Sequence, residues 1–423
     1  MSMFALLSLL VTIGALFSFL SFRVLRLPTS IGTMVLSLAA AAALLFCAPF
    51  EPGLHSAAQR IVGGIDFNAV VLHGMLALLL FAGSLQLDLP QLSREKLPVT
   101  VLSIGSTALS TVVVAVLFKY ALQAVGLPIS IMAALLFGAL ISPTDPIAVL
   151  EMLRRVGASA SLETQLAGES LFNDGVGAVI FLALLSASTG GAAPSARGFL
   201  VMLFLKAGGA ILLGGGLGYL TYRLIRLVDG YRVEVLLTLA LAMGGYALAD
   251  ALHLSAPLEV VTAGLLVSGR ARHFAMSELT REHVERFWEL IDDIMNVVLF
   301  LLLGLQLLVL PIERRYLFAG LLAIPVALAA RWVSVAIPVG ILNLFQQRVP
   351  GTVAVLTWGG LRGGLAVALA LSVPRGQGLE RNELLVATYI VVVFSILVQG
   401  LTISPLLRHL GLTSNSTAAH PTA

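Results

Sequence analysis

Long apolar runs dominate this sequence, and their length constrains the fold more than any other feature. The first of them, residues 3–22, contains no charged side chain. A helix needs about 20 apolar residues to cross the hydrocarbon core of a bilayer. The 423 residues are 58% hydrophobic and only 11% charged, whereas soluble domains carry roughly 25% charged residues. The sequence therefore predicts an all-α polytopic membrane protein, because the short alternating segments of a transmembrane β-barrel are not seen.

About thirteen runs have the length and apolarity of membrane spans, and the ninth is the shortest. They cover residues 3–22, 28–48, 66–86, 98–125, 128–151, 161–187, 198–226, 231–252, 256–270, 287–310, 315–345, 350–373 and 382–408. Two stretches, 88–97 and 274–286, are polar enough to be interfacial helices. We expect residues 187–196 to form a loop and 411–423 to form a short cytoplasmic tail.

The distribution of basic residues predicts the orientation of these spans. Arg23 and Arg26 follow the first apolar run instead of preceding it, so this run is predicted to be a span and not a signal peptide. With the N-terminus outside, 15 basic residues lie in the tail and in the loops that follow odd-numbered spans, and seven lie on the opposite side. The positive-inside rule makes the richer side the cytoplasm. We therefore expect a multi-pass cell-membrane protein with a cytoplasmic C-terminus. Its partner is the lipid bilayer, and the net charge of +3 gives no indication of nucleic-acid binding.

Two of the predicted spans contain residues that break a helix. The fifth contains Ser-Pro-Thr-Asp-Pro at 142–146, and prolines remove backbone donors. The twelfth contains Trp-Gly-Gly-Leu-Arg-Gly-Gly at 358–364. Proline and glycine are common in membrane helices, but interruptions at corresponding positions of two halves indicate a transporter binding site. The breaks lie seven spans apart, which fits an inverted repeat of spans 1–6 and 8–13, with two broken helices that cross. The negative charge of Asp145 is then suited to offset the partial positive charge of helix N-termini. The positive charge of Arg362 is suited to offset the partial negative charge of helix C-termini.

The sixth span begins with the polar cluster Gly-Glu-Ser-Leu-Phe-Asn-Asp-Gly at 168–175. Arg331 lies in the middle of a span and needs an acid, and we assign Glu169 to it as a structural ion pair. Asp174 then remains as the carboxylate that can exchange a bound proton for a bound cation. Na⁺ prefers hard oxygen ligands, which Asp174, the Ser170 hydroxyl and the Thr144 carbonyl freed by the break supply. Asp145 is a further ligand, bound directly or through water.

Other interpretations of these residues carry less weight. Asp292, Asp293 and Asn296 open the tenth span, where an interfacial cap or a vestibule is the simpler role. Asp145 and Asp174 on adjacent spans also suit an intramembrane aspartyl protease, but the Tyr-Asp and Gly-x-Gly-Asp contexts of that class are missing. The sequence contains no filter-like repeat of a cation channel. We expect a transporter, not an enzyme, and no cofactor.

These motifs together resemble the monovalent cation/proton antiporter family in its sodium/proton exchanger branch. The match covers residues 142–146, 168–175, Phe-Trp-Glu at 287–289, Phe-Leu-Leu-Leu-Gly-Leu at 300–305, Arg331, and Gly-Leu-Arg-Gly at 360–363. The resemblance implies exchange of Na⁺ or Li⁺ for H⁺ by an elevator-like movement, without an obligatory protein partner. It places the cation and proton at Thr144, Asp145, Ser170, Asn173 and Asp174, and the structural ion pair at Glu169 and Arg331.

The resemblance also implies how the single transporter domain, residues 1–410, is divided. A homodimer would form through residues 1–97 and 231–310. The ion-carrying core would be residues 98–187 and 315–410, and residues 198–226 would link the two parts.

Two positions bear on ion choice and stoichiometry. Some relatives have an acid in the third span, where this chain has Ala82, so the site is expected to be one carboxylate poorer. Some have two adjacent aspartates where this chain has Asn173 and Asp174, so we expect electroneutral exchange of one cation for one proton. The oxygen ligands suit K⁺ as well, and K⁺/H⁺ exchange is the alternative.

Overall fold

The computed structural model describes residues 3–157, 160–189, 196–271, 275–344, 351–374 and 380–412. Within these ranges the regular structure consists of helices, and no strand is present. The predicted all-α class is confirmed. Most of the predicted tail, residues 413–423, and residues 190–195 of the predicted loop lie outside the described residues.

Ten continuous helical stretches in the described residues are long and apolar enough to cross a membrane. Their main parts are α1 (Met3–Leu20), α2 (Thr29–Cys47), α4 (Leu76–Gln86), α7 (Thr107–Ala124), α10 (Ala160–Thr189), α11 (Ala196–Ile225), α12 (Tyr231–Ala251), α15 (Glu278–Leu305), α16 (Arg314–Asn343) and α19 (Arg381–Phe394). Short helical segments extend several of them: η1 (Ser21–Leu25), η2 (Ala69–Met75), α6 (Lys96–Thr100), η3 (Val101–Ser106), η5 (Gln306–Val309), η6 (Ser395–Gln399) and α20 (Gly400–His409).

Three further predicted spans are short or interrupted. The ninth is α13 (Ala256–Leu266), which continues into η4 (Val267–Ala271). The fifth is divided into α8 (Ile131–Ile141) and α9 (Ile147–Val156), and the twelfth into α17 (Thr352–Trp358) and α18 (Gly364–Ser372). The count of thirteen spans and the inverted repeat remain predictions.

The structure differs from the sequence-based expectation around two polar stretches. A short helix, α3 (Pro52–Gly63), follows α2 and was not expected, whereas α5 (Leu89–Arg94) lies in the predicted interfacial stretch 88–97. Of the predicted interfacial helix 274–286, residue 274 lies outside the described residues, and residues 278–286 are instead the beginning of α15. Ser277 caps this helix by accepting from the Thr280 N–H, and no proline or glycine separates its polar start from its apolar part. The change from polar to apolar composition therefore occurs within one helix.

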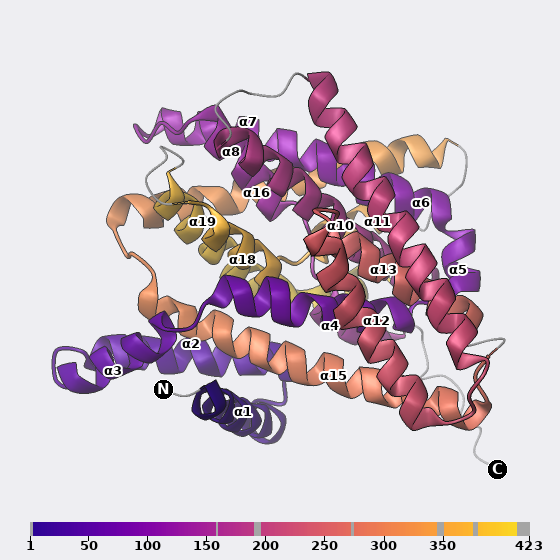
Figure 1. The fold of residues 1–423 in the computed structure, drawn as a ribbon. Coiled ribbons are helices and arrows are strands. Elements are labelled where there is room, and N and C mark those ends of the chain that lie inside the picture. The colour runs from indigo at the N-terminus through magenta and orange to yellow at the C-terminus, as the bar shows by residue number, and fades with distance from the viewer. Residues whose placement is uncertain are drawn as a thin grey trace, which may run out of the picture.

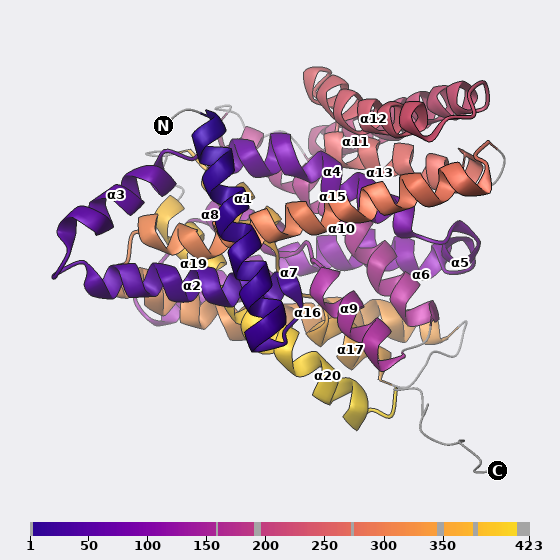
Figure 2. The same ribbon diagram turned by 90° about the horizontal axis from the view of Figure 1, so that it is seen from below.

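The helices form two packed groups (Figure 1). In one group α16 packs against α7 and α19, and α8 packs against α7, α10 and α18. In the other group α15 packs against α2 and α4, and α13 packs against α4, α11 and α12. Figure 2 shows α11 and α12 together at one end of the molecule, with α16, α17 and α20 at the opposite end. The two groups meet where α10 contacts α13 and α4.

Glycines allow α13 to approach its neighbours closely. A Cβ atom at Gly175 of α10 would lie 2.6 Å from Leu258 Cδ2, and one at Gly218 of α11 would lie 3.1 Å from the Ala263 carbonyl oxygen. Small residues at such crossings bring helix backbones into van der Waals contact, which stabilises helix pairs inside a membrane. The contact at Gly175 places α13 directly beside the residue that follows Asp174.

Candidate cation-binding site

The two interrupted segments cross, and their non-helical residues bond to each other. The Asp145 N–H donates to the Leu361 carbonyl oxygen at 2.8 Å. Proline at 143 and 146 prevents a regular helix in the first break, and the glycines around Leu361 permit the second. Each break therefore provides the hydrogen-bond partner for a backbone group that the other break leaves free. In a membrane interior, polar backbone groups need such partners within the protein.

Arg362 stabilises the end of α8 at this crossing. Its Nη1 atom donates to the carbonyl oxygens of Ser142 at 2.6 Å and Pro143 at 2.9 Å, and its backbone N–H donates to Ser395 Oγ at 2.9 Å. The last carbonyls of a helix carry partial negative charge, which a cation stabilises. The buried guanidinium thus lies at a helix C-terminus.

Asp145 lies at the opposite kind of helix end. Its Oδ1 atom accepts a hydrogen bond from the Ile147 N–H at 3.1 Å, at the first residue of α9. A carboxylate is stabilised at a helix N-terminus by the partial positive charge there. The backbone of Gly363 passes so close that a Cβ atom at this position would lie 2.8 Å from Asp145 Cβ.

Asn173 and Ser170 of α10 hold the first break from the side. Asn173 Nδ2 donates to Thr144 Oγ1 at 2.8 Å, and the Thr144 N–H donates to Asn173 Oδ1 at 3.2 Å. Ser170 Oγ donates to the Thr144 carbonyl oxygen. All three side chains are buried. The polar atoms of Thr144 are therefore fixed in position by α10.

Glu169 and Arg331 form a buried ion pair. Glu169 Oε1 lies 2.5 Å from Arg331 Nη1, and the two side chains are 1% and 4% exposed. Arg331 Nε and Nη2 also donate to the Leu356 carbonyl oxygen at 3.2 and 3.1 Å. Gly360 gives the guanidinium room, since a Cβ atom there would lie 2.6 Å from Arg331 Nε. The pair connects α10, α16 and α17, next to the second break.

Asp174 differs from these residues because no described residue bonds to its carboxylate. It lies one turn after Ser170 on the same face of α10 and is half-buried. Asp145, Ser170 and Asp174 line a common cavity of about 760 Å³. Of the acids brought together at the crossing, Asp174 is the one that faces the cavity without a protein donor in the described part of the chain.

The cavity extends from the crossing towards Leu87 and Arg154, on the face that the distribution of basic residues predicts to be cytoplasmic. Its wall includes Glu289, Asp292 and Asp293 of α15. Ala82, where some relatives have an acid, is fully buried and does not line the cavity.

Asp292 lies on the cavity wall, and the sequence analysis expected an interfacial cap or a vestibule at this position. Its Oδ2 atom accepts from Gln86 Nε2 and its Oδ1 atom from Asn296 Nδ2, each at 3.1 Å. The sequence signal for this role was its position one turn before Asn296, near the start of a largely apolar span. The helix α15 brings this carboxylate to the wall opposite the broken helices, a placement that depends on tertiary packing.

This chain is similar to known proteins over most of its length. Residues 6–409 match the family described as "Sodium/hydrogen exchanger, transmembrane". The chain is 42% identical over 419 residues to the Na⁺/H⁺ antiporter NhaP of Pseudomonas aeruginosa, covering 96% of this chain and 97% of that protein. It is 33% identical over 367 residues to the Na⁺/H⁺ antiporter NhaH of Halobacillus dabanensis, covering 85% of this chain and 88% of that protein.

The fold is similar to a solved structure of the sodium proton antiporter MjNhaP1 from Methanocaldococcus jannaschii. The TM-score is 0.75 at 20% sequence identity, and the superposition covers 96% of this chain and 98% of the other. At this identity the likeness concerns the fold. Together with the match over residues 6–409, it identifies a multi-pass membrane protein. The chain belongs to the sodium/hydrogen exchanger family, as the motifs in its sequence predict.

Proposed function

We propose that this protein is a secondary antiporter that exchanges Na⁺ or Li⁺ for H⁺, with Asp174 as the shared binding site. The observation that carries the proposal is the difference between the three acids at the crossing. Glu169 is neutralised by Arg331, and Asp145 caps α9, whereas Asp174 faces the cavity without a partner in the described residues. The names of the relatives, Na⁺/H⁺ antiporters, favour sodium over potassium as the cation.

The groups beside Asp174 provide the oxygen ligands that a small hard cation prefers. Because the Ser170 hydroxyl donates its hydrogen to the Thr144 carbonyl oxygen, the lone pairs of Ser170 Oγ are free to contact a cation. The Thr144 carbonyl oxygen retains a second lone pair. Asp174, Ser170 and Thr144 thus form the cation site, with Asp145 beside it and Asn173 fixing the Thr144 backbone.

The charge balance supports a one-for-one exchange. Asp174 binds either a proton or a monovalent cation, and the occupied site has the same charge in both cases. The amide of Asn173 is occupied by Thr144 and contributes no second exchangeable proton. An empty, ionised site is costly to move through the membrane, so the carrier crosses only when loaded. Protons and cations therefore compete for the same carboxylate.

The cavity supports an alternating-access movement of the core, residues 98–187 and 315–410, against the remaining helices. In this structure the cavity reaches the predicted cytoplasmic face. On the other side of the crossing Asn68, the residue before η2, donates to the Ala368 carbonyl oxygen of α18 at 2.7 Å, which joins the two parts. This arrangement corresponds to the inward-facing state of an elevator-like carrier. We infer that the carrier works as a homodimer through residues 1–97 and 231–310.

Exchange in proteoliposomes tests the proposal. A proton gradient is imposed on the full-length protein, and Na⁺, Li⁺ and K⁺ are added in turn while the internal pH is followed. We expect Na⁺ and Li⁺ to dissipate the gradient, and the D174N variant to be inactive with both. Undiminished exchange by D174N would refute the site, and a response to K⁺ alone would favour the potassium alternative. A rate that changes with an imposed potential would contradict one-for-one exchange.

A further inference from the structure

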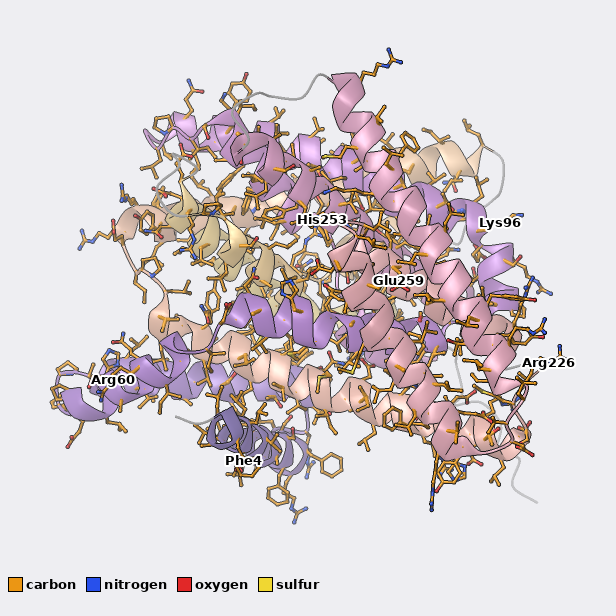
Figure 3. All side chains as sticks on the ribbon, viewed as in Figure 1. Phe4, Arg60, Lys96, Arg226, His253 and Glu259 are labelled. Atoms are coloured by element: carbon orange, nitrogen blue, oxygen red, sulfur yellow. The ribbon has the colours of Figure 1, made fainter. Side chains whose placement is uncertain are left out.

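A second acid, Glu259, is buried away from the cation site. It lies in α13 and is 0% exposed. Figure 3 shows Glu259 inside the bundle, while Arg60, Lys96 and Arg226 lie at the edges of the molecule. Neither carboxylate oxygen of Glu259 has a hydrogen-bond partner among the described residues, and no described cation lies within 4.0 Å. This differs from Glu169, which is equally buried but paired.

The backbone of α12 encloses the Glu259 carboxyl group. A Cβ atom at Gly245 would lie 2.5 Å from Glu259 Oε1 and 2.9 Å from Oε2. On the α11 side the packing is equally close, since a Cβ atom at Gly214 would lie 3.1 Å from the Glu259 carbonyl carbon. The missing side chain at Gly245 therefore makes the space that the carboxyl group fills. Glu259 is not part of the cavity that contains Asp174.

The charged or protonatable residues on the surrounding helices do not neutralise Glu259. The helix α4 carries none, as its sequence is Leu-Ala-Leu-Leu-Leu-Phe-Ala-Gly-Ser-Leu-Gln. None of the charged or protonatable residues on the other elements packed against α13 forms a hydrogen bond or an ion pair with Glu259. These residues are Arg197, Lys206, Tyr219, Tyr222 and Arg223 on α11, Tyr231, Arg232, Glu234, Tyr246 and Asp250 on α12, Glu163, Glu169 and Asp174 on α10, and Arg270 in η4. Arg270 instead lies over the Tyr219 ring, 5.9 Å from its centre. The Lys206 carbonyl oxygen accepts from the Ser255 N–H at 3.3 Å, just before the start of α13.

An unpaired ionised carboxylate in this position is costly, because charge in the membrane interior costs several kcal/mol. We propose that Glu259 is a second proton-binding site, which holds a non-transported proton as a neutral carboxylic acid between α12 and α13. Protonation allows the Glu259 carboxyl group to pack against the α12 backbone, because the neutral group places no charge between the two helices. The site is independent of the proposed exchange reaction.

Infrared difference spectroscopy of the full-length protein in liposomes at neutral pH tests this proposal. The spectrum of E259Q is subtracted from that of the wild type. We expect the difference to contain the C=O stretch of a protonated carboxylic acid and no ionised-carboxylate band. The control is E282Q, because Glu282 is exposed on α15 and paired with Arg286, and its removal should take away an ionised-carboxylate band. Loss of an ionised band in E259Q would overturn the proposal.

A second pair of variants gives the same test without altering Glu259. G245A places a methyl group against the carboxyl group, and we expect it to shift the protonated C=O band. G244A is the matched control, because nothing lies within 4 Å of a Cβ atom there. A band that G245A leaves unmoved would also overturn the proposal. Exchange by E259Q should match the wild type, whereas D174N is expected to be inactive.

Discussion

Thr144 and Asn173 hold each other by two hydrogen bonds that run in opposite directions. The Thr144 N–H donates to Asn173 Oδ1 at 3.2 Å, and Asn173 Nδ2 donates to Thr144 Oγ1 at 2.8 Å. The pair is buried and joins the first break to α10. It fixes the Thr144 carbonyl beside Asp174 and keeps the residue before Asp174 uncharged. Asn173 therefore affects both the geometry and the charge of the site.

The variant N173D separates these two effects. An aspartate at this position accepts from the Thr144 N–H and, after the hydroxyl rotates, from Thr144 Oγ1 as well, so we expect the fold to persist. The added acid changes the charge of the loaded site, and exchange should become sensitive to an imposed membrane potential. The measurement is the initial exchange rate in proteoliposomes at several potentials.

The control for this prediction is N173A, which removes both hydrogen bonds. It leaves the buried Thr144 N–H unpaired, which costs about 1–3 kcal/mol, and should lower thermal stability without adding voltage dependence. An N173D protein that is active but indifferent to voltage would contradict the role given to Asn173.

The Glu169–Arg331 pair predicts a stability effect that depends on which partner is removed. Removing Arg331 alone, as in R331M, leaves a buried uncompensated carboxylate, which costs about 3–5 kcal/mol. The double variant E169Q/R331M removes both charges and should recover much of that loss. The remaining deficit reflects the Leu356 carbonyl oxygen, which loses its two donors. Thermal unfolding of the wild type, E169Q, R331M and the double variant in detergent measures the coupling, and additive losses would show that the pair contributes little.

Arg362 is expected to act through two carbonyl groups. R362A leaves the Ser142 and Pro143 carbonyl oxygens unpaired at the end of α8, at about 1–3 kcal/mol for each buried group. R362K keeps the positive charge at the helix end but lacks the planar fork, so it should be intermediate. Maximal exchange rate and thermal stability should fall in the order wild type, R362K, R362A. A lysine variant as impaired as the alanine variant would mean that the fork geometry, not the charge, is required.

The sequence allowed prediction of those features that follow from local composition or charge balance. The two prolines at 143 and 146 and the glycines around Leu361 are local helix breakers, and the structure has breaks at both positions. A buried arginine needs an acid, which led to Glu169 as the partner of Arg331. Neither argument required knowledge of the packing.

Other features depend on the packing and were beyond the sequence. The hydrogen bond from the Asp145 N–H to the Leu361 carbonyl joins residues far apart in the chain, and only the crossing of the two breaks defines it. Asp292 enters the cavity because α15 lies opposite the broken helices. The boundary of α15 was also misplaced, because a change from polar to apolar composition does not end a helix when no proline or glycine marks the point.

Asp292 is expected to raise the local cation concentration in the cavity. D292N should increase the KM for Na⁺ with little change in maximal rate, because the acid lies on the cavity wall and is not one of the proposed ligands. The effect should shrink as ionic strength rises, since the screening length falls from about 10 Å at 0.1 M salt to about 3 Å at 1 M. The matched control E282Q changes an exposed acid of the same helix outside the cavity. An effect that is independent of salt would indicate a structural role for the hydrogen bonds from Gln86 and Asn296.

Gly363 limits the space beside Asp145 and predicts a steric effect on transport. Its φ of −111° is accessible to any L-residue, so G363A introduces no backbone strain. The new methyl group would lie 2.8 Å from Asp145 Cβ and must displace it, and overpacking of this kind costs about 1–3 kcal/mol. Asp145 would move away from the Ile147 N–H, and the cavity wall beside Asp174 would change shape. Relative to the wild type, we expect G363A to lose a larger fraction of its exchange rate than of its thermal stability. G208A is the control, because a Cβ atom there has nothing within 4 Å. Normal exchange by G363A would show that Asp145 does not need its position against the second break.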